Sequence, residues 1–255
     1  MKHLLLLALT LLAAAPAAAQ KAPILVPDVS QHRIDLQSGF TGAELLLFGA
    51  IAYPGGRIPE GKIDIAVVIE GPRKPITVRE KAKLGGVIWV NAESNSYRTA
   101  PSFYAVASSR PIADIIDERE AYVYEIGLKH LQLSPIQVGD TREQLRFRDG
   151  LIATNVEDGS YSQSSGSVQI TRKLLYQARI EIPASVPVGT YDASTYLIRN
   201  GKVVSVAETE VVVGKRGFEQ FVSIVAARYG LAYGLVAVLI SLGLGWAAGA
   251  LFHRR

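Results

Sequence analysis

The chain contains no cysteine among its 255 residues. This absence excludes a disulfide framework, a thiolate metal site and a cysteine nucleophile. A chain without disulfides must be stabilised by its own apolar core. The roughly 210 residues between the two apolar ends are enough for one large domain or two small ones.

Histidine is scarce, and neither sign of charge dominates. His32, His130 and His253 are far apart in the chain, so the sequence predicts no imidazole metal centre and no cofactor. Outside Lys2 and the C-terminal Arg254 and Arg255, 24 of the 27 basic residues remain against 23 acidic ones. No basic stripe is interleaved with aromatic residues, so nucleic acid is not an expected partner.

Long hydrophobic runs occur only at the two ends of the chain. At the N-terminus, basic Lys2 and His3 precede an apolar run, Leu4–Leu12, and the small residues Ala17–Ala19 follow it. This order predicts a signal peptide over residues 1–19, which is removed so that Gln20 begins the mature protein. The alternative is an uncleaved anchor, but the run is short.

The C-terminal run, Leu231–Phe252, has no charged residue. A helix of roughly 22 residues at about 1.5 Å per residue spans about 33 Å, enough for the hydrocarbon core of a bilayer. The sequence therefore predicts a juxtamembrane segment at 214–230, a transmembrane helix at 231–252 and a cytoplasmic tail at 253–255. Basic residues flank both ends of the helix, so the export signal decides its orientation. The body then lies outside the cytoplasm.

The body between these ends has the pattern of a β protein. Short β-branched and aromatic runs are separated by glycine, proline and asparagine, and Asn200-Gly201 suits a type I′ hairpin turn. The pattern predicts immunoglobulin-like antiparallel sandwiches, with a barrel as the alternative. The expected strands are residues 32–36, 43–52, 63–70, 76–78, 87–90, 102–107, 174–182, 191–199 and 202–213.

A helical insertion or connector is expected over residues 109–166. Ser109 and Pro111 suit the start of a helix that reaches Ile126, and a capping-box pattern at 140–143 predicts a second helix. Residues 158–166 are polar and predict a flexible loop. The insertion divides a β-rich domain at 20–108 from a second β-rich part at 167–213. Two small domains, or one sandwich with an insertion, both fit.

Two motifs with catalytic or binding associations are weak. Residues 56–62 have the G-x₄-G-K spacing of a phosphate loop, but Ile63 replaces the required serine or threonine and a strand follows. We therefore expect a β-hairpin loop there. Ser30, His32 and Asp35 include the residue types of a hydrolytic triad but crowd the start of one strand. An edge-strand histidine is the better interpretation.

A group of acidic residues on the first expected helix does not have the alternating pattern of a calcium loop, which also needs a central glycine. We interpret it as the solvated face of a helix. Its members are Asp114, Asp117, Glu118 and Glu120.

The C-terminal helix carries a small residue at every fourth position: Ala237, Ser241, Gly245 and Gly249. This spacing keeps the four close to one face, where another helix can approach closely. We predict a helix-packing face that serves a homodimer or docks on a multi-spanning partner. The alternative is chance, because glycine and alanine are common in membrane helices.

Several sequence patterns together resemble a family of alphaproteobacterial transmembrane proteins. The resemblance covers nearly the whole mature chain and implies a Gram-negative inner membrane with a periplasmic body. It implies no catalytic residues, and it suggests a transport partner such as a sulfite-exporter-like permease. The residues that carry it are Phe40–Gly42, Leu47–Gly49, Pro101–Tyr104, Ala178–Ala184, Val186–Tyr191, Asn200-Gly201, Gly217–Glu219, Tyr229-Gly230 and Gly245-Trp246.

From these patterns we expect a non-enzymatic accessory or interaction subunit of a membrane complex. A second hypothesis is a small-ligand-binding module in which the helical insertion forms one wall. A third, an envelope hydrolase, requires a catalytic group that comes together only in three dimensions. The aromatic residues available to line a pocket are Trp89, Tyr97, Tyr104 and Tyr122, but core packing is the better interpretation of them.

Overall fold

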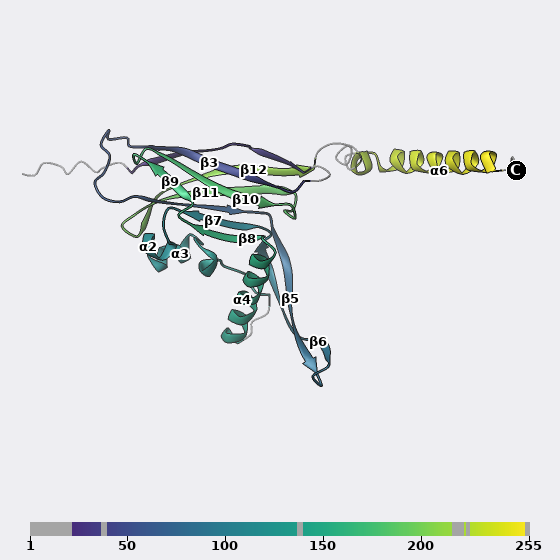
Figure 1. Cartoon of the computed structure of the whole chain (residues 1–255), viewed down its shortest axis with the longest axis horizontal. Helices are drawn as coiled ribbons and strands as arrows, with labels where there is room; N and C mark the ends of the chain where they lie inside the picture. The colour runs from purple at the N-terminus through teal and green to yellow at the C-terminus, as the bar shows by residue number, and fades with distance from the viewer. Residues whose placement is uncertain (1–21, 37–39, 137–139, 216–221, 223–224, 253–255) are drawn as a thin grey trace, which may run out of the picture.

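Two β-sheets face each other across one apolar core in the computed structural model, which describes residues 22–36, 40–136, 140–215, 222 and 225–252 (Figure 1). The four-stranded sheet has the order β1 (Ile24–Val29), β3 (Gly42–Ala52), β10 (Leu175–Pro183), β9 (Val168–Thr171). The six-stranded sheet has the order β2 (Arg33–Leu36), β12 (Lys202–Lys215), β11 (Gly189–Arg199), β4 (Asp64–Glu70), β7 (Tyr104–Ser108), β8 (Tyr161–Ser165).

Strands from both sides of the helical insertion combine in each sheet. β3 pairs with β10 in the first sheet, and β4 pairs with β11 in the second. The β-rich segments before and after the insertion therefore build one sandwich. Most pairs are antiparallel, as predicted, but the two edge strands of the six-stranded sheet are parallel to their neighbours: β2 to β12, and β8 to β7.

The alternation of side chains explains why the six-stranded sheet is covered on both faces. In β4, Ile65, Val67 and Ile69 point into the core between the sheets. The intervening Ala66 and Val68 belong to a second cluster on the opposite face. Because successive side chains of a strand point to opposite faces, a run of six buried residues marks a strand that is enclosed on both sides.

The second cluster is covered by the helical insertion, seen below the sandwich in Figure 1. A single helix was predicted from Ser109 to Ile126, and this prediction is wrong. Ile116 is extended and forms a bridge with Gly201 in the β11–β12 turn, so the helix is interrupted there. The insertion instead contains α2 (Ile112–Ile115), α3 (Glu118–Val123), the 3₁₀ helix η1 (Leu128–His130) and α4 (Thr141–Glu157).

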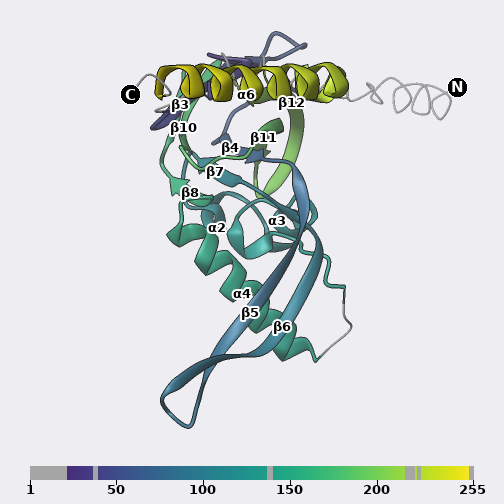
Figure 2. The ribbon, with the colours of Figure 1, turned by 90° about the vertical axis from the view of Figure 1, so that its right-hand side faces the viewer.

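A long hairpin, β5 (Arg73–Leu84) and β6 (Ile88–Pro101), projects from the sandwich with α4 beside its base (Figure 2). A small core of Tyr97, Ala100, Phe147 and Leu151 joins the two. The predicted start of α4 is confirmed, because the side chain of Asp140 accepts a hydrogen bond from the backbone N–H of Arg142. Only short parts of this hairpin were predicted as strands.

The strand β8 lies where a flexible polar loop was predicted. Its Tyr161 is buried against Tyr104 at 6.0 Å between ring centroids, whereas its next four residues are exposed. An edge strand that buries one side chain lacks the apolar alternation on which strand prediction depends. β1 was also missed. Pro27 lies in it without disrupting a ladder, because β1 is an edge strand.

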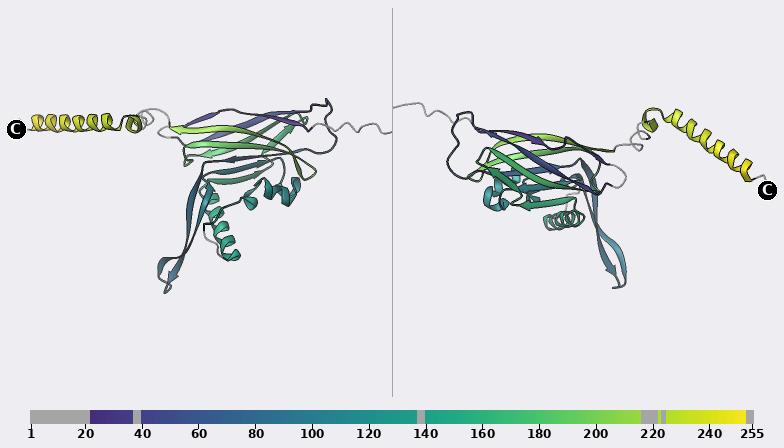
Figure 3. Two further views of the ribbon diagram at one scale, coloured as in Figure 1. Left: turned by 180° about the vertical axis from the view of Figure 1, so that it is seen from behind. Right: turned by 45° about the horizontal axis from the view of Figure 1, so that its top comes forward.

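The chain ends in α6 (Gly230–Phe252), which stands away from the sandwich in both views of Figure 3. A helix was predicted here. Across the stretches that the structure describes, no helix is both long and apolar enough to cross a membrane. The predicted signal peptide, the cytoplasmic tail and residues 216–221 and 223–224 of the juxtamembrane segment lie outside the described residues.

Candidate functional site

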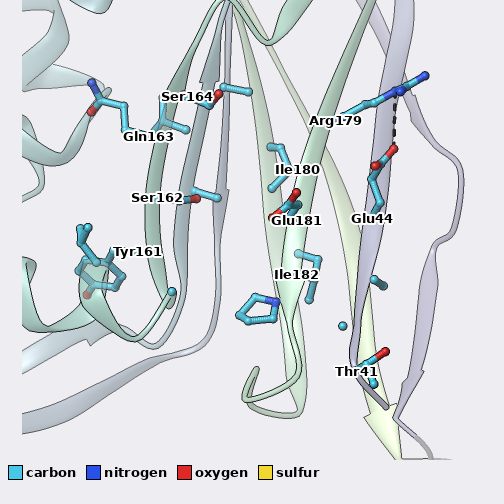
Figure 4. A pocket seen from close by; sticks show the side chains of 18 residues that line it. Thr41, Glu44, Tyr161, Ser162, Gln163, Ser164, Arg179, Ile180, Glu181 and Ile182 are labelled. Carbon is cyan, nitrogen blue, oxygen red and sulfur yellow. Dashed lines mark ion pairs between the residues drawn. The ribbon is translucent and has the colours of Figure 1, made fainter. Parts of the chain in front are cut away.

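One hollow lies at β8, the edge strand of the six-stranded sheet, opposite β3 and β10 of the other sheet (Figure 4). We call this hollow the edge groove. It has a volume of about 840 Å³ and an open side. β3 and β10 form one wall, β7 and β8 form the other, and the end of α4 closes one end. Its lining includes Thr41, Ala105, Ala107, Val156, Ser162, Ser164, Ile180 and Ile182.

The register of β8 determines the polarity of this groove. Ser162 pairs with Ala105 and Ser164 pairs with Ala107, and both alanines point into the core between the sheets. The serine side chains therefore occupy positions where the inner strands carry apolar groups. Ile180 and Ile182 from β10 supply the apolar wall. The groove thus combines aliphatic surface with two exposed hydroxyl groups.

Glu44, Arg179 and Glu181 are also among the residues that line the edge groove, and all three occupy exposed positions of β3 and β10. Along β10, Ile180 and Ile182 are buried whereas Arg179 and Glu181 are exposed, so alternation places the two charges on the outer face of the sheet. Arg179 pairs there with Glu44 at 3.6 Å, on the side away from the serines in Figure 4. Hydrogen bonding and apolar contact are therefore the interactions that this groove offers.

A half-buried ionic cluster joins the root of the hairpin to the helical insertion. Arg73 donates hydrogen bonds to Glu70 at 2.8 Å and to Glu125 at 3.3 Å. Burial raises the pKa of Glu70 above its ordinary value, although the Arg73 guanidinium opposes this shift. The hydroxyl of Tyr104 also donates to the backbone carbonyl of Glu125. One guanidinium serves two carboxylates, so we assign the cluster to holding the layers together.

The three residues with the side-chain types of a hydrolytic triad each have a partner of their own. The hydroxyl of Ser30 accepts from the backbone N–H of Leu46, and His32 lies 3.4 Å from Asp28. Asp35 pairs with Arg33 at 2.9 Å. Each of the three groups thus has its own local partner, and His32 stands immediately before edge strand β2, as interpreted from the sequence.

The stretch with phosphate-loop spacing is a crossover between the two sheets, from β3 to β4, and not the hairpin loop expected from the sequence. Its backbone carbonyls at Pro59 and Gly61 accept hydrogen bonds from the Lys173 ammonium, at 3.3 and 2.7 Å. A phosphate site would need converging N–H donors. Here the loop instead binds the positively charged side chain of Lys173 through its backbone carbonyls.

The acidic residues of the insertion also separate. Glu118 pairs with Lys129 at 2.8 Å, while Glu120 accepts from the backbone of Val203 at 3.4 Å. The Nδ1 atom of His130 has a hydrogen-bond partner nearby in the chain, the backbone carbonyl of Ile126 at 3.0 Å. Among the described residues, no group of three histidine, aspartate or glutamate side chains could hold a metal ion. His253 lies outside them.

Of the four aromatic residues named for a pocket, Tyr97 and Tyr122 line one small hollow of about 230 Å³, whereas Trp89 and Tyr104 lie elsewhere. Trp89 is at the exposed end of the hairpin, and Tyr97 is buried beneath α4. Tyr104 belongs to the core under the insertion, whereas Tyr122 is mostly exposed. The serines of the edge groove were missed because β8 was expected to be a loop. The alternation of apolar residues in 174–182 was a usable signal for the wall opposite them.

The four small residues predicted as a helix-packing face recur along α6 as expected from their spacing. Ser241 donates a hydrogen bond to the carbonyl of Ala237 at 2.9 Å, which turns its hydroxyl toward its own helix. A Cβ atom added at Gly245 or Gly249 would meet nothing within 4 Å. These positions are thus open within a single chain.

These features define a mainly β protein with an apolar C-terminal helix outside its core. Residues 24–254 match the family described as "Putative transmembrane protein (Alph_Pro_TM)". The chain belongs to this family, which is alphaproteobacterial by name, and the resemblance noted in the sequence is confirmed. No curated protein and no solved structure matches the chain.

Proposed function

We propose that this chain is a single-pass inner-membrane protein whose β-rich, immunoglobulin-like body lies in the periplasm. It acts as a non-enzymatic accessory or interaction subunit of a membrane complex, with a permease or a second copy of the chain as its partner. The observation that carries this proposal is α6, an uncharged helix that contributes no residue to any of the three apolar cores.

Support for the membrane placement comes from the uncharged run of residues 231–252 in the sequence. Among the described residues, no helix is both long and apolar enough to cross a membrane. Large side chains along it have no cover in the single chain: Leu231 is 95% exposed and Trp246 is 78% exposed. Leaving such a surface in water costs roughly 25 cal/mol per Å². The signal-peptide pattern of 1–19 and the family support an exported body.

Support for a partner comes from the small-residue face of α6. Lipid does not drive helices together by the hydrophobic effect, so close backbone approach at small residues is a main source of association. Gly245 and Gly249 are open on this face. A leucine at either position fits the single chain without a clash, yet it would hold a second helix away. Substitution there tests association separately from folding.

The test uses the Gly245→Leu, Gly249→Leu double variant in gently solubilised membranes. We expect the parent to co-purify with a membrane protein or a second copy, and the variant to lose most of that partner. The matched control is Gly243→Leu, Ala247→Leu, which has the same spacing on the opposite face of α6. Carbonate extraction should leave all three proteins in the membrane pellet. An unchanged partner in the double variant would overturn the assembly role.

A small-ligand-binding module is the second candidate, and the edge groove favours it. Its volume of about 840 Å³ lies within the usual range for ligand sites, and it presents hydroxyls beside an aliphatic wall. Native mass spectrometry of protein from its own membranes should then show a retained small molecule. The Ser162→Leu, Ser164→Leu variant should lose it. A mass equal to the polypeptide alone would remove this candidate.

A further inference from the structure

The distal half of the β5–β6 hairpin has a different environment from its base. Part-way along the hairpin, Arg146 of α4 lies between Glu80, at 3.2 Å, and Glu93, and ties the hairpin to the helix. The hairpin is a two-stranded sheet along its whole length, and beyond this point residues 81–84 pair with 88–91. A two-stranded ribbon is at best marginally stable in water by itself. The contacts within this chain therefore do not explain why the distal part of the hairpin projects from the body.

The end of this hairpin is apolar. Val87 is 83% exposed, and Ile88 and Trp89 are each 62% exposed. Gly85 and Gly86 have φ values of +62° and +77°, which makes the turn tight enough to bring these side chains to the very end. Three neighbouring large apolar residues at the end of a projection are placed for contact with something other than this chain.

The charges next to this apolar end are all positive. We define the hairpin tip as Lys81, Lys83 and Gly85–Trp89. No acidic residue occurs between Glu80 and Glu93, and the Lys83 ammonium lies 5.1 Å from the centre of the Trp89 ring. Tryptophan with lysine is the combination found at the interface between a bilayer and water. Each basic residue near an anionic lipid surface contributes favourable attraction.

We propose that the hairpin tip inserts into the headgroup region of an anionic lipid bilayer. This inference rests on the proposed membrane anchoring through α6. In Figure 1 the hairpin points down from the right-hand end of the sandwich, and α6 begins beyond that same end, so one flat surface along this end can meet both with the body on one side. Attachment at two points fixes how the body faces the membrane, whereas α6 alone leaves it free to turn.

The chain contains two tryptophans, one at each proposed lipid contact, which allows the two contacts to be measured separately. Trp246→Phe leaves Trp89 in the tip as the only indole, and Trp89→Phe leaves Trp246 in α6. Each full-length variant is reconstituted into vesicles of phosphatidylethanolamine and phosphatidylglycerol with brominated acyl chains. We expect Trp89 fluorescence to shift to shorter wavelength, to be quenched by the brominated lipid and to be protected from aqueous acrylamide.

Charge reversal separates lipid attraction from nonspecific burial. Lys81→Glu, Lys83→Glu, placed on the Trp246→Phe background, should abolish the shift and the lipid quenching. The control Lys62→Glu, Lys202→Glu changes the net charge equally at two exposed sites away from the tip and should retain both. Vesicles of phosphatidylcholine alone should reduce the effect in the protein with intact lysines.

The outcomes distinguish the two proposals. If Trp246 is quenched by brominated lipid and Trp89 remains open to acrylamide, α6 is in the bilayer and the tip proposal is overturned. If neither is quenched, the anchoring proposal fails as well. If Trp89 is protected in native membranes but open in the lipid vesicles, a protein covers the tip and the lipid assignment is wrong.

Discussion

At the scale of single residues, Gly49 shows how closely the strands approach in the four-stranded sheet. A Cβ atom at this position would overlap the backbone carbonyl of Val26 on β1 and lie 2.6 Å from the Tyr176 hydroxyl on β10. The first of these groups, the Val26 carbonyl, belongs to the backbone, so it cannot rotate away from the added methyl group. We expect Gly49→Ala to lower the free energy of unfolding by about 1–3 kcal/mol. Urea denaturation followed by far-UV circular dichroism measures the change.

The matched control is Gly55→Ala, in the loop that leaves the same strand. An added Cβ at Gly55 would meet nothing within 4 Å, and its backbone is not in the left-handed region. Its unfolding midpoint should stay close to that of the parent. Equal midpoints for the two variants would show that β1 is packed less tightly against β3 than the structure indicates.

Glu70 provides a pH-dependent prediction. Burial raises the pKa of its carboxyl in the folded state, so the folded protein holds this proton more tightly than the unfolded chain. The corresponding contribution to stability is present at low pH and is lost as pH rises through the raised pKa. Glu70→Gln remains neutral at every pH. We therefore expect the parent to lose stability relative to Glu70→Gln as pH rises above 4.5, the ordinary pKa of a glutamate.

Parallel denaturation series for the two proteins measure this trend, and a constant offset from the altered Arg73 pairing does not affect it. The control is Glu44→Gln, since Glu44 is an exposed carboxylate whose pair with Arg179 lies on the outer face of the sheet. A parent that gains stability relative to Glu70→Gln as pH rises would contradict the raised pKa.

Features that depend on residues adjacent in the sequence were predictable, whereas close approaches between atoms of distant strands were not. Asn200 and Gly201 both have positive φ, as the type I′ turn requires, and Asp140 caps α4. Each of these depends on neighbours along the chain. The crowding at Gly49 depends on Val26 and Tyr176, which come from other strands. One sequence does not reveal which distant groups will meet.

At the scale of elements, strands with clear apolar patterning were predicted and those without it were missed. Residues 176–182 alternate between apolar and polar side chains, and β10 has the corresponding burial pattern. β8 buries little besides Tyr161, so its edge groove could not be anticipated. The break between α2 and α3 arises from Ile116 bridging Gly201, a tertiary contact that overrides helical periodicity.

The attachment of α4 to the hairpin gives a prediction at this scale. Phe147 is 3% exposed in the small core with Tyr97 and Leu151. Phe147→Ala removes most of the side chain that joins the two elements, and we expect a loss of about 3 kcal/mol or more in local stability. Hydrogen exchange in α4 and the base of β6 should quicken, while exchange in β3 and β4 should change little.

Leu145→Ala is the control on the same helix, because Leu145 is exposed and lies outside this core. Its exchange should resemble that of the parent. Faster exchange spread through β3 and β4 in Phe147→Ala would mean that α4 stabilises the whole sandwich, contrary to the separate cores seen in the structure.

At the scale of the whole molecule, the sequence left open whether the β-rich parts were two domains or one. The structure shows one sandwich, because β3 of the first part pairs along its length with β10 of the second. The residues of one strand do not indicate which distant strand will pair with it, so a single sequence could not show whether the β-rich parts form one domain or two. The hairpin and α6 project from this sandwich, and they are the parts that we propose contact the membrane.

The absence of cysteine allows a direct test of which side of the membrane the body faces, because any introduced thiol is unique. Gly55→Cys places one in a loop of the body where an added side chain meets nothing within 4 Å. His253→Cys places one in the C-terminal tail. In cells with a permeabilised outer membrane, a membrane-impermeant maleimide should label only the Gly55→Cys protein, and the tail variant should react only after lysis. The parent should not react in either condition. Labelling of the tail variant in unlysed cells would reverse or abolish the proposed orientation, because an apolar helix that separates the two sites must place them on opposite sides of the bilayer.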